Sequence, residues 1–270
     1  MLRIATFNVN GIRASHQRGF AAWNERALPD VVALQEVRCP VESLPPDAWC
    51  GLHAAYDPGT LAGRNGVAVL SRVPPADVRT GIGDREFASE GRYLEVDLDL
   101  PEAPLTVASL YLPKGSTRAS DPAKYQRKQR FMASFTRHLT KARRDARRRG
   151  REFLVMGDFN VAHTTLDVTN WRANQRNEGF LPEERAWFGE QLGPRTLVDV
   201  VRTLHPDTAG PNSWWRWGGR TFEDDTGWRI DYHLASPGLA SRAVAAWTDR
   251  PTSSGDRLSD HAPVLVDYAV

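Results

Sequence analysis

Short apolar runs recur along the whole chain, and they restrict its fold more than any other feature of the sequence. Runs this short are typical of buried or half-buried strands, whereas an amphipathic helix needs a longer pattern that repeats about every 3.6 residues. The runs are Arg3 to Val9, Val31 to Gln35, Val67 to Leu70, Tyr93 to Leu98, Thr106 to Tyr111, Phe153 to Met156, Ile230 to Leu234 and Val264 to Val266. They predict a fold built on β-sheets.

Two helical patterns interrupt these strands. Between Ala123 and Arg149, the residues Phe131, Phe135 and Leu139 recur at every fourth position and form one apolar stripe. A second pattern opens at Pro182 with two glutamates in its first turn, as helix starts prefer. Many strands with few long helices predict a layered α/β fold, and periodicity alone leaves a sandwich and an open sheet as alternatives.

The composition is that of an ordinary globular protein. Of the 270 residues, 41% are hydrophobic and 25% are charged, and no linker or internal repeat divides the chain, so we expect a single domain over residues 1–270. No run approaches the roughly 18 apolar residues of a membrane span, and the start of the chain carries no export-signal pattern. With two cysteines, Cys39 and Cys50, we expect reduced thiols and a cytoplasmic protein.

The net charge of +2 is too small to indicate a nucleic-acid partner, but the charge is unevenly distributed. From Lys124 to Arg151 there are twelve lysines and arginines and one acid, Asp145, while the rest of the chain is net acidic. The stretch ends in RRRGR at 147–151, which is typical of a helix C-terminus. We interpret it as the solvated face of a helix, with a nucleic-acid contact as the alternative.

Polar residues capable of chemistry lie within or directly after strand-like runs in six separate segments. These are N-x-N-G at 8–11, Q-E at 35–36, Y-x-P at 111–113, G-D-x-N at 157–160, R-I-D at 229–231 and S-D-H-A-P at 259–263. Each alone is a weak signal, because an Asn after a strand is usually a turn former and a lone Glu is usually solvated. Loops on a rigid scaffold commonly carry active sites, so the six together indicate a catalytic centre.

Longer stretches around these motifs carry a family resemblance. The stretches FNVNGIRA, GDFNVAHTTLDVTNW, GFLPEERAWF, GWRIDYHLAS and SDHAPVLVDY resemble the exonuclease III family of abasic-site nucleases, within the endonuclease/exonuclease/phosphatase superfamily. Superfamily members that hydrolyse inositol phosphates, sphingomyelin or poly(A) are similar at G-D-x-N and S-D-H but not in the A-H-x-x-x-D or tryptophan-rich segments. The resemblance implies a four-layer α/β sandwich of two mixed, face-to-face sheets with helices outside and the site at one edge.

The resemblance also implies Mg²⁺-assisted hydrolysis of a phosphodiester, with Mn²⁺ as a substitute. That reaction needs a metal, an activated water and donors for the developing charge. Glu36 is implied as the main metal ligand, with Asn10 and Asp260 binding directly or through water. Some members of the family have Asp where Asn10 stands.

The G-D-x-N motif is implied to supply the water-activating group. Asp158 would activate the attacking water or orient it, and Asn160, two residues further, would share the same face and help to hold it. Asn8 would be the orienting amide for Asp158. We interpret His163 and Asp167 as structural residues that brace this loop.

The resemblance implies that two further side chains contact the negatively charged phosphoryl group. His261 would donate to a phosphoryl oxygen, with Asp231 accepting from its other ring nitrogen and favouring the cationic form. Tyr111 would be a phosphate-facing phenol.

Contacts to DNA follow from family positions. Those near the DNA backbone or in a groove are Arg64, Lys114, Asn170, Asn174 and Asn177. Many relatives have an amide where Lys114 stands, and a cation at this position can also meet a phosphate. Acids at 223–225 would repel phosphates, and we expect them to point away from the duplex.

Tryptophans are concentrated near the end of the chain, and some of them must fill the core. Aligned without gaps back from Asp231, the residues Trp214, Trp228 and Ile230 fall on the family's pocket for a flipped-out sugar without a base. An apolar slot of that size would select a base-free sugar, because a normal nucleotide would clash and would first have to be unstacked.

The sequence therefore predicts a monomeric DNA-repair nuclease that cleaves duplex DNA 5′ to an abasic site, with 3′-5′ exonuclease and 3′-phosphatase activity on blocked 3′ ends. The main alternative is a 3′ exonuclease or 3′-phosphatase with minor abasic cleavage. Two other classes are a phosphoesterase for lipid or small-molecule substrates and a catalytically silent DNA-binding module. The silent module would be expected to lack Glu36, Asp158 or His261, and all three are present.

Overall fold

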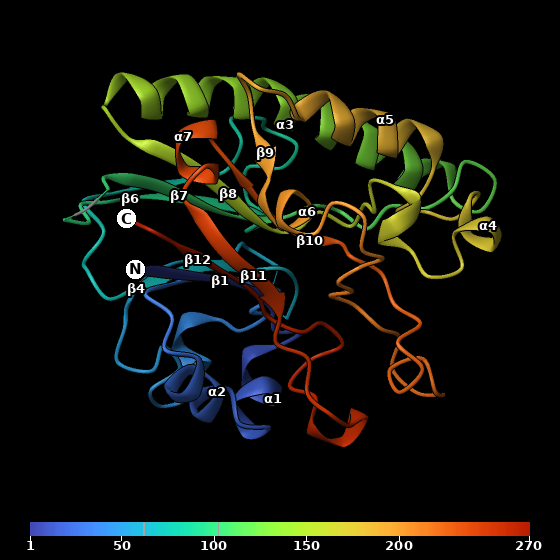
Figure 1. The fold of residues 1–270 in the computed structure, drawn as a ribbon, viewed down its shortest axis with the longest axis horizontal. Helices are drawn as coiled ribbons and strands as arrows, with labels where there is room; N and C mark the ends of the chain where they lie inside the picture. Colours follow the sequence, from blue (N-terminus) through green and yellow to red (C-terminus); the bar gives the residue numbers. More distant parts are fainter. Residues whose placement is uncertain (62, 102) are drawn as a thin grey trace.

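The computed structural model describes residues 1–61, 63–101 and 103–270, and these form two mixed β-sheets that pack face to face (Figure 1). The first sheet has the order β11-β12-β1-β2-β4-β3, with β1 (Leu2–Asn8), β2 (Val31–Gln35), β3 (His53–Asp57), β4 (Val67–Ser71), β11 (Ala243–Thr248) and β12 (Val264–Tyr268). The second has the order β5-β6-β7-β8-β10-β9, with β5 (Asp77–Thr80), β6 (Tyr93–Leu98), β7 (Leu105–Tyr111), β8 (Glu152–Asp158), β9 (Val198–Asp199) and β10 (Asp231–Ala235).

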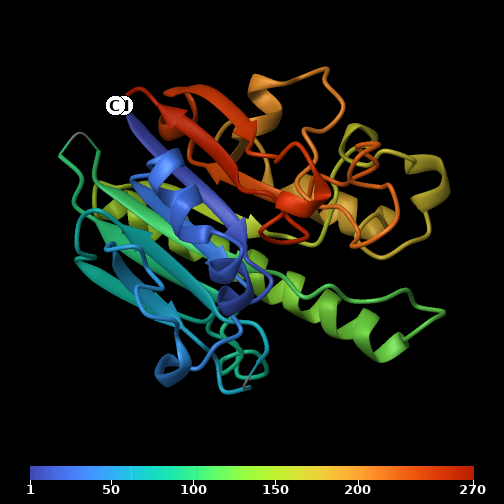
Figure 2. The same cartoon turned by 90° about the horizontal axis from the view of Figure 1, so that it is seen from below.

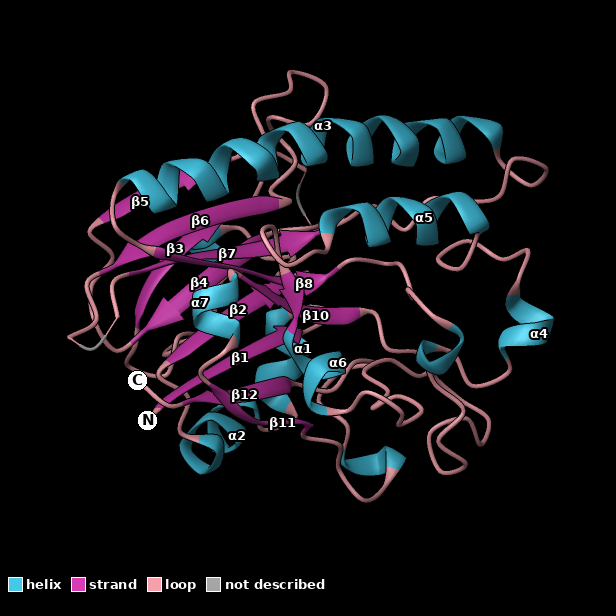
Figure 3. Cartoon of the chain, turned by 45° about the horizontal axis from the view of Figure 1, so that its top comes forward, coloured by secondary structure: helices cyan, strands magenta, loops and turns pink. Residues whose placement is uncertain are grey.

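Helices cover the outer face of each sheet (Figure 3). The helices are α1 (Ile12–Gln17) and α2 (Phe20–Ala27) on the first sheet, α3 (Pro122–Arg148) and α5 (Pro182–Gln191) on the second, and the short α4 (Trp171–Asn174), α6 (Val200–Leu204) and α7 (Pro237–Ala240). Single 3₁₀ turns lie at Val41–Ser43, Thr165–Asp167 and Ser254–Asp256. In the part of the chain that the structure describes, no helix has the length and apolar character needed to cross a bilayer.

Side-chain alternation along the strands produces the layers. Ile4 of β1 and Leu154 of β8 point into the core between the sheets, whereas their neighbours Ala5 and Phe153 pack against the outer helices. The apolar stripe of α3 packs on the outer face of the second sheet, as its spacing predicts. The prediction of a four-layer α/β sandwich is confirmed. Cys39, in the outer core of the first sheet, and half-buried Cys50 are free thiols.

The eight predicted strands are all present, with ends shifted by no more than two residues, and α3 and α5 lie where the two helical patterns predict them. Sequence periodicity missed β3, β5, β9, β11 and the shorter helices. β5 and β11 are edge strands whose side chains, apart from that of Ala246, are exposed or only partly buried. β5 has no apolar run, and the apolar residues of β11 do not alternate with polar ones. α3 ends at Arg148, and Gly150 follows with a φ of 70°, as its C-terminal pattern indicates.

Strand direction brings the six motif segments to one edge of the sandwich. β1 runs parallel to β2, and β7 runs parallel to β8, so the C-terminal ends of each pair meet. β10 runs antiparallel to β8, which places Asp231 directly opposite Asp158. β12 runs antiparallel to β1, so the segment 259–263 that precedes it lies at the same end. At the other end the chain termini meet, since Leu2 pairs with Tyr268 (Figure 2).

Candidate active site

A cleft of about 650 Å³ opens at this edge, between loops of both sheets. Of the residues predicted for the site, the following line it: Asn10, Glu36, Tyr111, Lys114, Asp158, Asn160, Asn174, Asn177, Trp214, Trp228, Ile230, Asp260 and His261. Asn8 and Asp231 are buried directly behind these side chains and bond to them. Arg64 and Asn170 do not line the cleft and are exposed.

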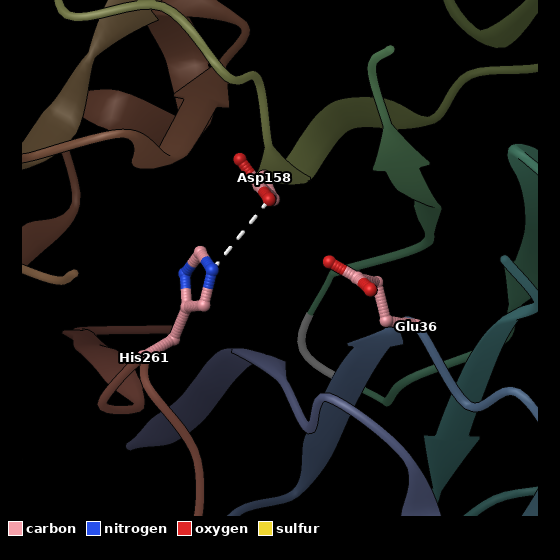
Figure 4. Close-up of side chains that lie close together, drawn as sticks. All are labelled: Glu36, Asp158 and His261. Carbon is pink, nitrogen blue, oxygen red and sulfur yellow. Dashed lines mark ion pairs between the residues drawn. The ribbon is translucent and has the colours of Figure 1, made fainter. Parts of the chain in front are cut away.

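His261 connects two carboxylates. Its Nδ1 lies 2.8 Å from Asp231 Oδ2, and its Nε2 lies 3.7 Å from Asp158 Oδ2 across the cleft (Figure 4). Asp231 Oδ2 also accepts from the hydroxyl of Ser213 at 2.6 Å, which fixes this carboxylate behind the ring. The imidazole is therefore held with one nitrogen on Asp231 and the other facing the cleft.

Electrostatics favour a protonated histidine. Burial acts to lower the pKa of His261, but the charges of Asp231 and Asp158 and the hydrogen bond to Asp231 outweigh it and raise this pKa to about 9. Burial raises the pKa of Asp158 to about 7, opposed by the positive charge of His261. A cationic imidazole beside a carboxylate of raised pKa is suited to moving protons and stabilising negative charge near neutral pH.

Two asparagines fix Asp158 through three amide donors. Asn8 Nδ2 donates to Asp158 Oδ2 at 3.0 Å, and the backbone and side-chain amides of Asn160 donate to the same carboxylate at 2.8 and 3.1 Å. Gly157 permits this arrangement, because a Cβ there would collide with the carbonyl oxygen of Leu110 in β7. The glycine of G-D-x-N thus lets β8 approach β7 at the point where the carboxylate is presented.

Oxygen donors suited to a metal ion surround the floor of the cleft. Ligand atoms of Glu36, Asp158 and His261 lie within 4.8 Å of one another. Because a histidine with a pKa near 9 is a cation, the carboxylates are the better donors of this group, and they are the hard ligands that divalent cations such as Mg²⁺ or Mn²⁺ prefer. The residues therefore fit a hard divalent cation.

The structure separates the predicted metal residues into two parts. Glu36 accepts from Asn8 Nδ2 at 2.9 Å, whereas Asn10 Nδ2 donates to Asp260 Oδ1 at 2.7 Å. Asp260 is not part of the group formed around Glu36 in the described chain. Its lowered pKa reflects burial, which opposes ionisation, outweighed by the charge of His261 and hydrogen bonds from Trp214 and Asn10.

Arg38 is a cleft residue that sequence reasoning missed. Its guanidinium forms an ion pair with Glu36 and lines the cleft. Both residues have left-handed backbones, with φ of 52° and 53°, a conformation that is uncommon away from glycine. The position of Arg38, two residues after the predicted ligand at a strand end, was the signal available in the sequence.

Aromatic side chains form one wall of the cleft. The rings of Trp214 and Trp228 are perpendicular, with centroids 6.3 Å apart, and Ile230 packs with them. Trp214 Nε1 donates to Asp260 Oδ2 at 3.1 Å, so this wall is joined to the predicted metal site. Of the neighbouring tryptophans, Trp215 is core and Trp217 is exposed.

Asp167 and His163 lie behind the loop that follows Asp158. Asp167 accepts from Arg229 at 2.7 Å and from Arg202 at 2.5 Å, and Arg229 also binds Asp199. Burial opposes ionisation of Asp167, yet the two arginines lower its pKa to about 2. His163 packs against Phe188. These contacts agree with the structural role predicted for both residues.

A buried ion pair braces the same loop from the helical side. Lys128 of α3, with 1% of its side chain exposed, places Nζ 2.7 Å from Glu184 Oε1 and donates to the carbonyl of Asn160 at 2.8 Å. Glu184 Oε2 accepts from the backbone amides of Gly179 and Leu181 at 2.7 and 3.1 Å. The pair therefore connects α3 and α5 to the loop that carries Asn160.

Removing one partner of this pair should destabilise the protein strongly. Lys128→Met leaves Glu184 as an unpaired buried charge, and we expect a loss of about 3–5 kcal/mol in the free energy of unfolding, measured by urea denaturation. The double variant Lys128→Met/Glu184→Gln should lose less of the free energy of unfolding, because no buried charge is left unpaired. Lys124→Met, which removes one partner of an exposed ion pair on the same helix, should change the free energy of unfolding little. Equal losses for Lys128→Met and Lys124→Met would contradict this assignment.

Comparison with known proteins agrees with the geometry. A model of the Endonuclease/Exonuclease/phosphatase family matches residues 5–261. The chain belongs to this family. It is 31% identical to exodeoxyribonuclease III of Haemophilus influenzae, over 99% of this chain and 100% of that protein.

Solved structures within the family share the whole fold. An AP endonuclease from Archaeoglobus fulgidus has a TM-score of 0.86 and 29% identity, with 100% of both chains covered. The 3′ phosphatase NExo from Neisseria, solved with a product DNA hairpin, has a TM-score of 0.87 and 27% identity, again with 100% of both chains covered. The predicted resemblance to exonuclease III and the prediction of a nuclease-type hydrolase are confirmed.

Proposed function

We propose that residues 1–270 form a single-domain DNA-repair nuclease that hydrolyses the phosphodiester 5′ to an abasic site in duplex DNA. The observation that carries the proposal is the cleft itself, in which the Asp158–His261–Asp231 chain faces Glu36 beside an apolar wall of Trp214 and Trp228. One cavity therefore contains both the polar groups that phosphodiester hydrolysis needs and an apolar wall suited to a sugar without a base.

The proposed mechanism divides the work among these side chains. Asp158, fixed by Asn8 and Asn160, orients the attacking water and accepts its proton, for which a raised pKa near 7 suits it. Cationic His261, held by Asp231, donates to a phosphoryl oxygen as negative charge develops there. The pKa of Tyr111 is raised to about 12 by burial and by Asp158, so its phenol stays protonated and can donate to the phosphate.

The proposed cofactor is Mg²⁺, with Mn²⁺ as a substitute. Glu36 is the principal ligand, and Asn10 and Asp260 contribute directly or through water. When bound, the cation neutralises phosphoryl oxygens. Arg38 already pairs with Glu36, so its guanidinium adds positive charge beside the same oxygens.

DNA recognition is proposed for residues around the cleft. Lys114, Asn174 and Asn177 line it and can meet phosphates. Arg64 and Asn170 lie outside it, so their proposed contacts are with the duplex beyond the cleaved bond. Of the acids at 223–225, Asp225 accepts from the indole of Trp215 at 2.9 Å, a contact that holds it against the protein.

A second candidate is a 3′ exonuclease or 3′-phosphatase with minor abasic cleavage, favoured by the similarity to NExo. One assay separates the two. Purified protein with Mg²⁺ is given three duplexes, which carry an internal abasic analogue, a 3′-phosphate and an undamaged recessed 3′ end. The fastest initial rate on the abasic duplex supports the proposed function, and a fastest rate on either 3′ substrate supports the alternative.

The apolar wall yields a prediction about specificity. Trp228 packs against Trp214 and Phe180 and is not one of the predicted metal ligands, so Trp228→Ala should selectively damage abasic cleavage while metal dependence survives. Loss of an aromatic contact to a nucleotide costs on the order of 1–3 kcal/mol, about a five- to 150-fold loss of rate. The rate of 3′-phosphate release should fall less than the rate of abasic cleavage.

The measured quantity is the ratio of the two activities in the variant and the parent, corrected by thermal melting for lost stability. Trp247→Ala, at a partly buried tryptophan on the edge strand β11, is the matched control and should leave the ratio unchanged. If both activities of Trp228→Ala fall by the same factor, Trp228 is a core residue and the pocket assignment is wrong.

A further inference from the structure

The C-terminal half of α3 presents a strongly basic face outside the cleft. A shallow hollow of about 640 Å³ on it is lined by Arg137, Thr140, Lys141, Arg144, Asp145, Arg147 and Arg148, which we call the basic face of α3. Asp145 forms an ion pair with Arg148. In the described chain the other four cations form no ion pair with a carboxylate.

The rest of α3 and its continuation behave differently. Arg127 pairs with Glu90 and Arg130 with Glu86, while Lys128 pairs with buried Glu184. Beyond the helix, Arg149 and Arg151 both pair with Asp97. Cations before and after the basic face are thus neutralised by neighbouring elements, whereas four of the five cations on the face are left for solvent or a ligand.

Helical geometry aligns three of the unpaired cations with Arg148, whose guanidinium also pairs with Asp145. Arg137, Lys141, Arg144 and Arg148 follow one another at intervals of four, three and four residues, so they form one stripe roughly 16 Å long. The opposite side of the helix carries the apolar stripe, buried on the second sheet. Burial and, to a smaller extent, the charge of Arg144 lower the pKa of neighbouring Arg143.

The basic face is remote from the cleft. Lys128 touches the backbone of Asn160, and Arg144 is sixteen residues further along the helix, roughly 24 Å away. α3 extends along the outside of the second sheet, from the cleft end to the far end (Figure 1, Figure 3). A ligand on this face therefore occupies a surface separate from the cleft.

We propose that the basic face of α3 binds the phosphate backbone of a second DNA segment while the cleft holds the segment to be cut; this rests on the proposed function. Four of the five cations are arginines, whose planar guanidinium matches phosphate oxygens in pairs. A lipid surface fits less well, because interfacial helices insert apolar side chains, and those of α3 are buried in the core. The face would hold the enzyme on DNA without reading sequence.

The test uses the full chain in EDTA, so that no DNA is cleaved. An unlabelled abasic hairpin saturates the cleft, and a labelled, end-closed, undamaged duplex is then titrated at several salt concentrations. Lys141→Ser/Arg144→Ser should lower the slope of log affinity against log salt by about 2, and should weaken binding about 60-fold at 0.1 M salt, since each phosphate contact contributes about 0.9 to the slope. Arg26→Ser/Arg195→Ser removes the same charge from exposed positions elsewhere and should change neither quantity.

Cleavage of a short abasic duplex with Mg²⁺ is measured on the same preparations and should be unchanged in both variants. If the parent does not cleave this duplex, the proposed function is wrong. The binding data test separately whether the basic face of α3 binds DNA. The inference is overturned if the parent binds no second duplex, if both variants keep the parent's salt slope, or if phosphatidylserine vesicles bind this face and DNA does not.

Discussion

Asp158→Asn should lower kcat by about 10²- to 10⁴-fold with the fold intact, and His261→Ala should do the same, because each group acts chiefly in the transition state. Asparagine keeps the size of Asp158 and its position near Asn8, but it cannot accept a proton from water. Alanine at 261 removes the cation held by Asp231 and leaves the developing phosphoryl charge without its donor. Initial rates at saturating DNA and Mg²⁺ measure the effect.

Two surface substitutions serve as matched controls for these variants. Asp207→Asn and His53→Ala change the same residue types at exposed positions and should keep the parent's rate. Thermal melting of all four proteins separates catalysis from stability. Should Asp158→Asn or His261→Ala retain more than about a tenth of the rate, a loss below about 1.4 kcal/mol, its assigned role is wrong.

Glu36→Gln should raise the Mg²⁺ concentration needed for half-maximal rate by at least about 100-fold and should also lower the rate at saturation. Changes to groups that merely support a metal ligand cost about 10- to 100-fold in affinity, so loss of the principal carboxylate should cost no less. DNA binding in EDTA should stay nearly the same, since the DNA contacts proposed around the cleft lie on other residues. Metal titrations of the initial rate give both quantities.

Glu42→Gln is the control, because Glu42 is exposed on the 3₁₀ turn that follows β2 and has no proposed role. It should leave the titration unchanged. Glu36→Gln also frees Arg38 from its ion pair, so a melting curve is needed to show that the cleft remains folded. A Mg²⁺ titration identical to the parent's would remove Glu36 from the role of ligand.

The sequence determined the elements of the fold whose side chains are buried. Central strands such as β2 and β6 are buried along their whole length, so their apolar runs gave the correct bounds. The apolar stripe of α3, with residues at every fourth position, could be predicted because one face of the helix must pack on a sheet. Edge strands such as β11 bury little and left no periodic signal, and their pairing with β12 depends on backbone hydrogen bonds that composition does not encode.

The candidate site divides in the same way. Its motif residues were recognisable because each follows or lies within a strand-like run, and the family resemblance assigned them roles. The sequence did not predict which residues form hydrogen bonds or ion pairs with them. Lys128 and Arg137 stand in one basic stretch, yet the fold buries Lys128 against Glu184 and leaves Arg137 exposed.

By itself, then, the sequence determined the layered fold, the family and the chemical inventory of the cleft, because burial patterns and motifs are local properties of the chain. Tertiary structure alone decided which charges meet. It placed Asp231 between Ser213 and His261, paired Arg38 with Glu36, and joined the tryptophan wall to Asp260. The physical reason is that electrostatic and hydrogen-bonding energies depend on distance and burial, which strand register and helix packing fix between residues far apart in the chain.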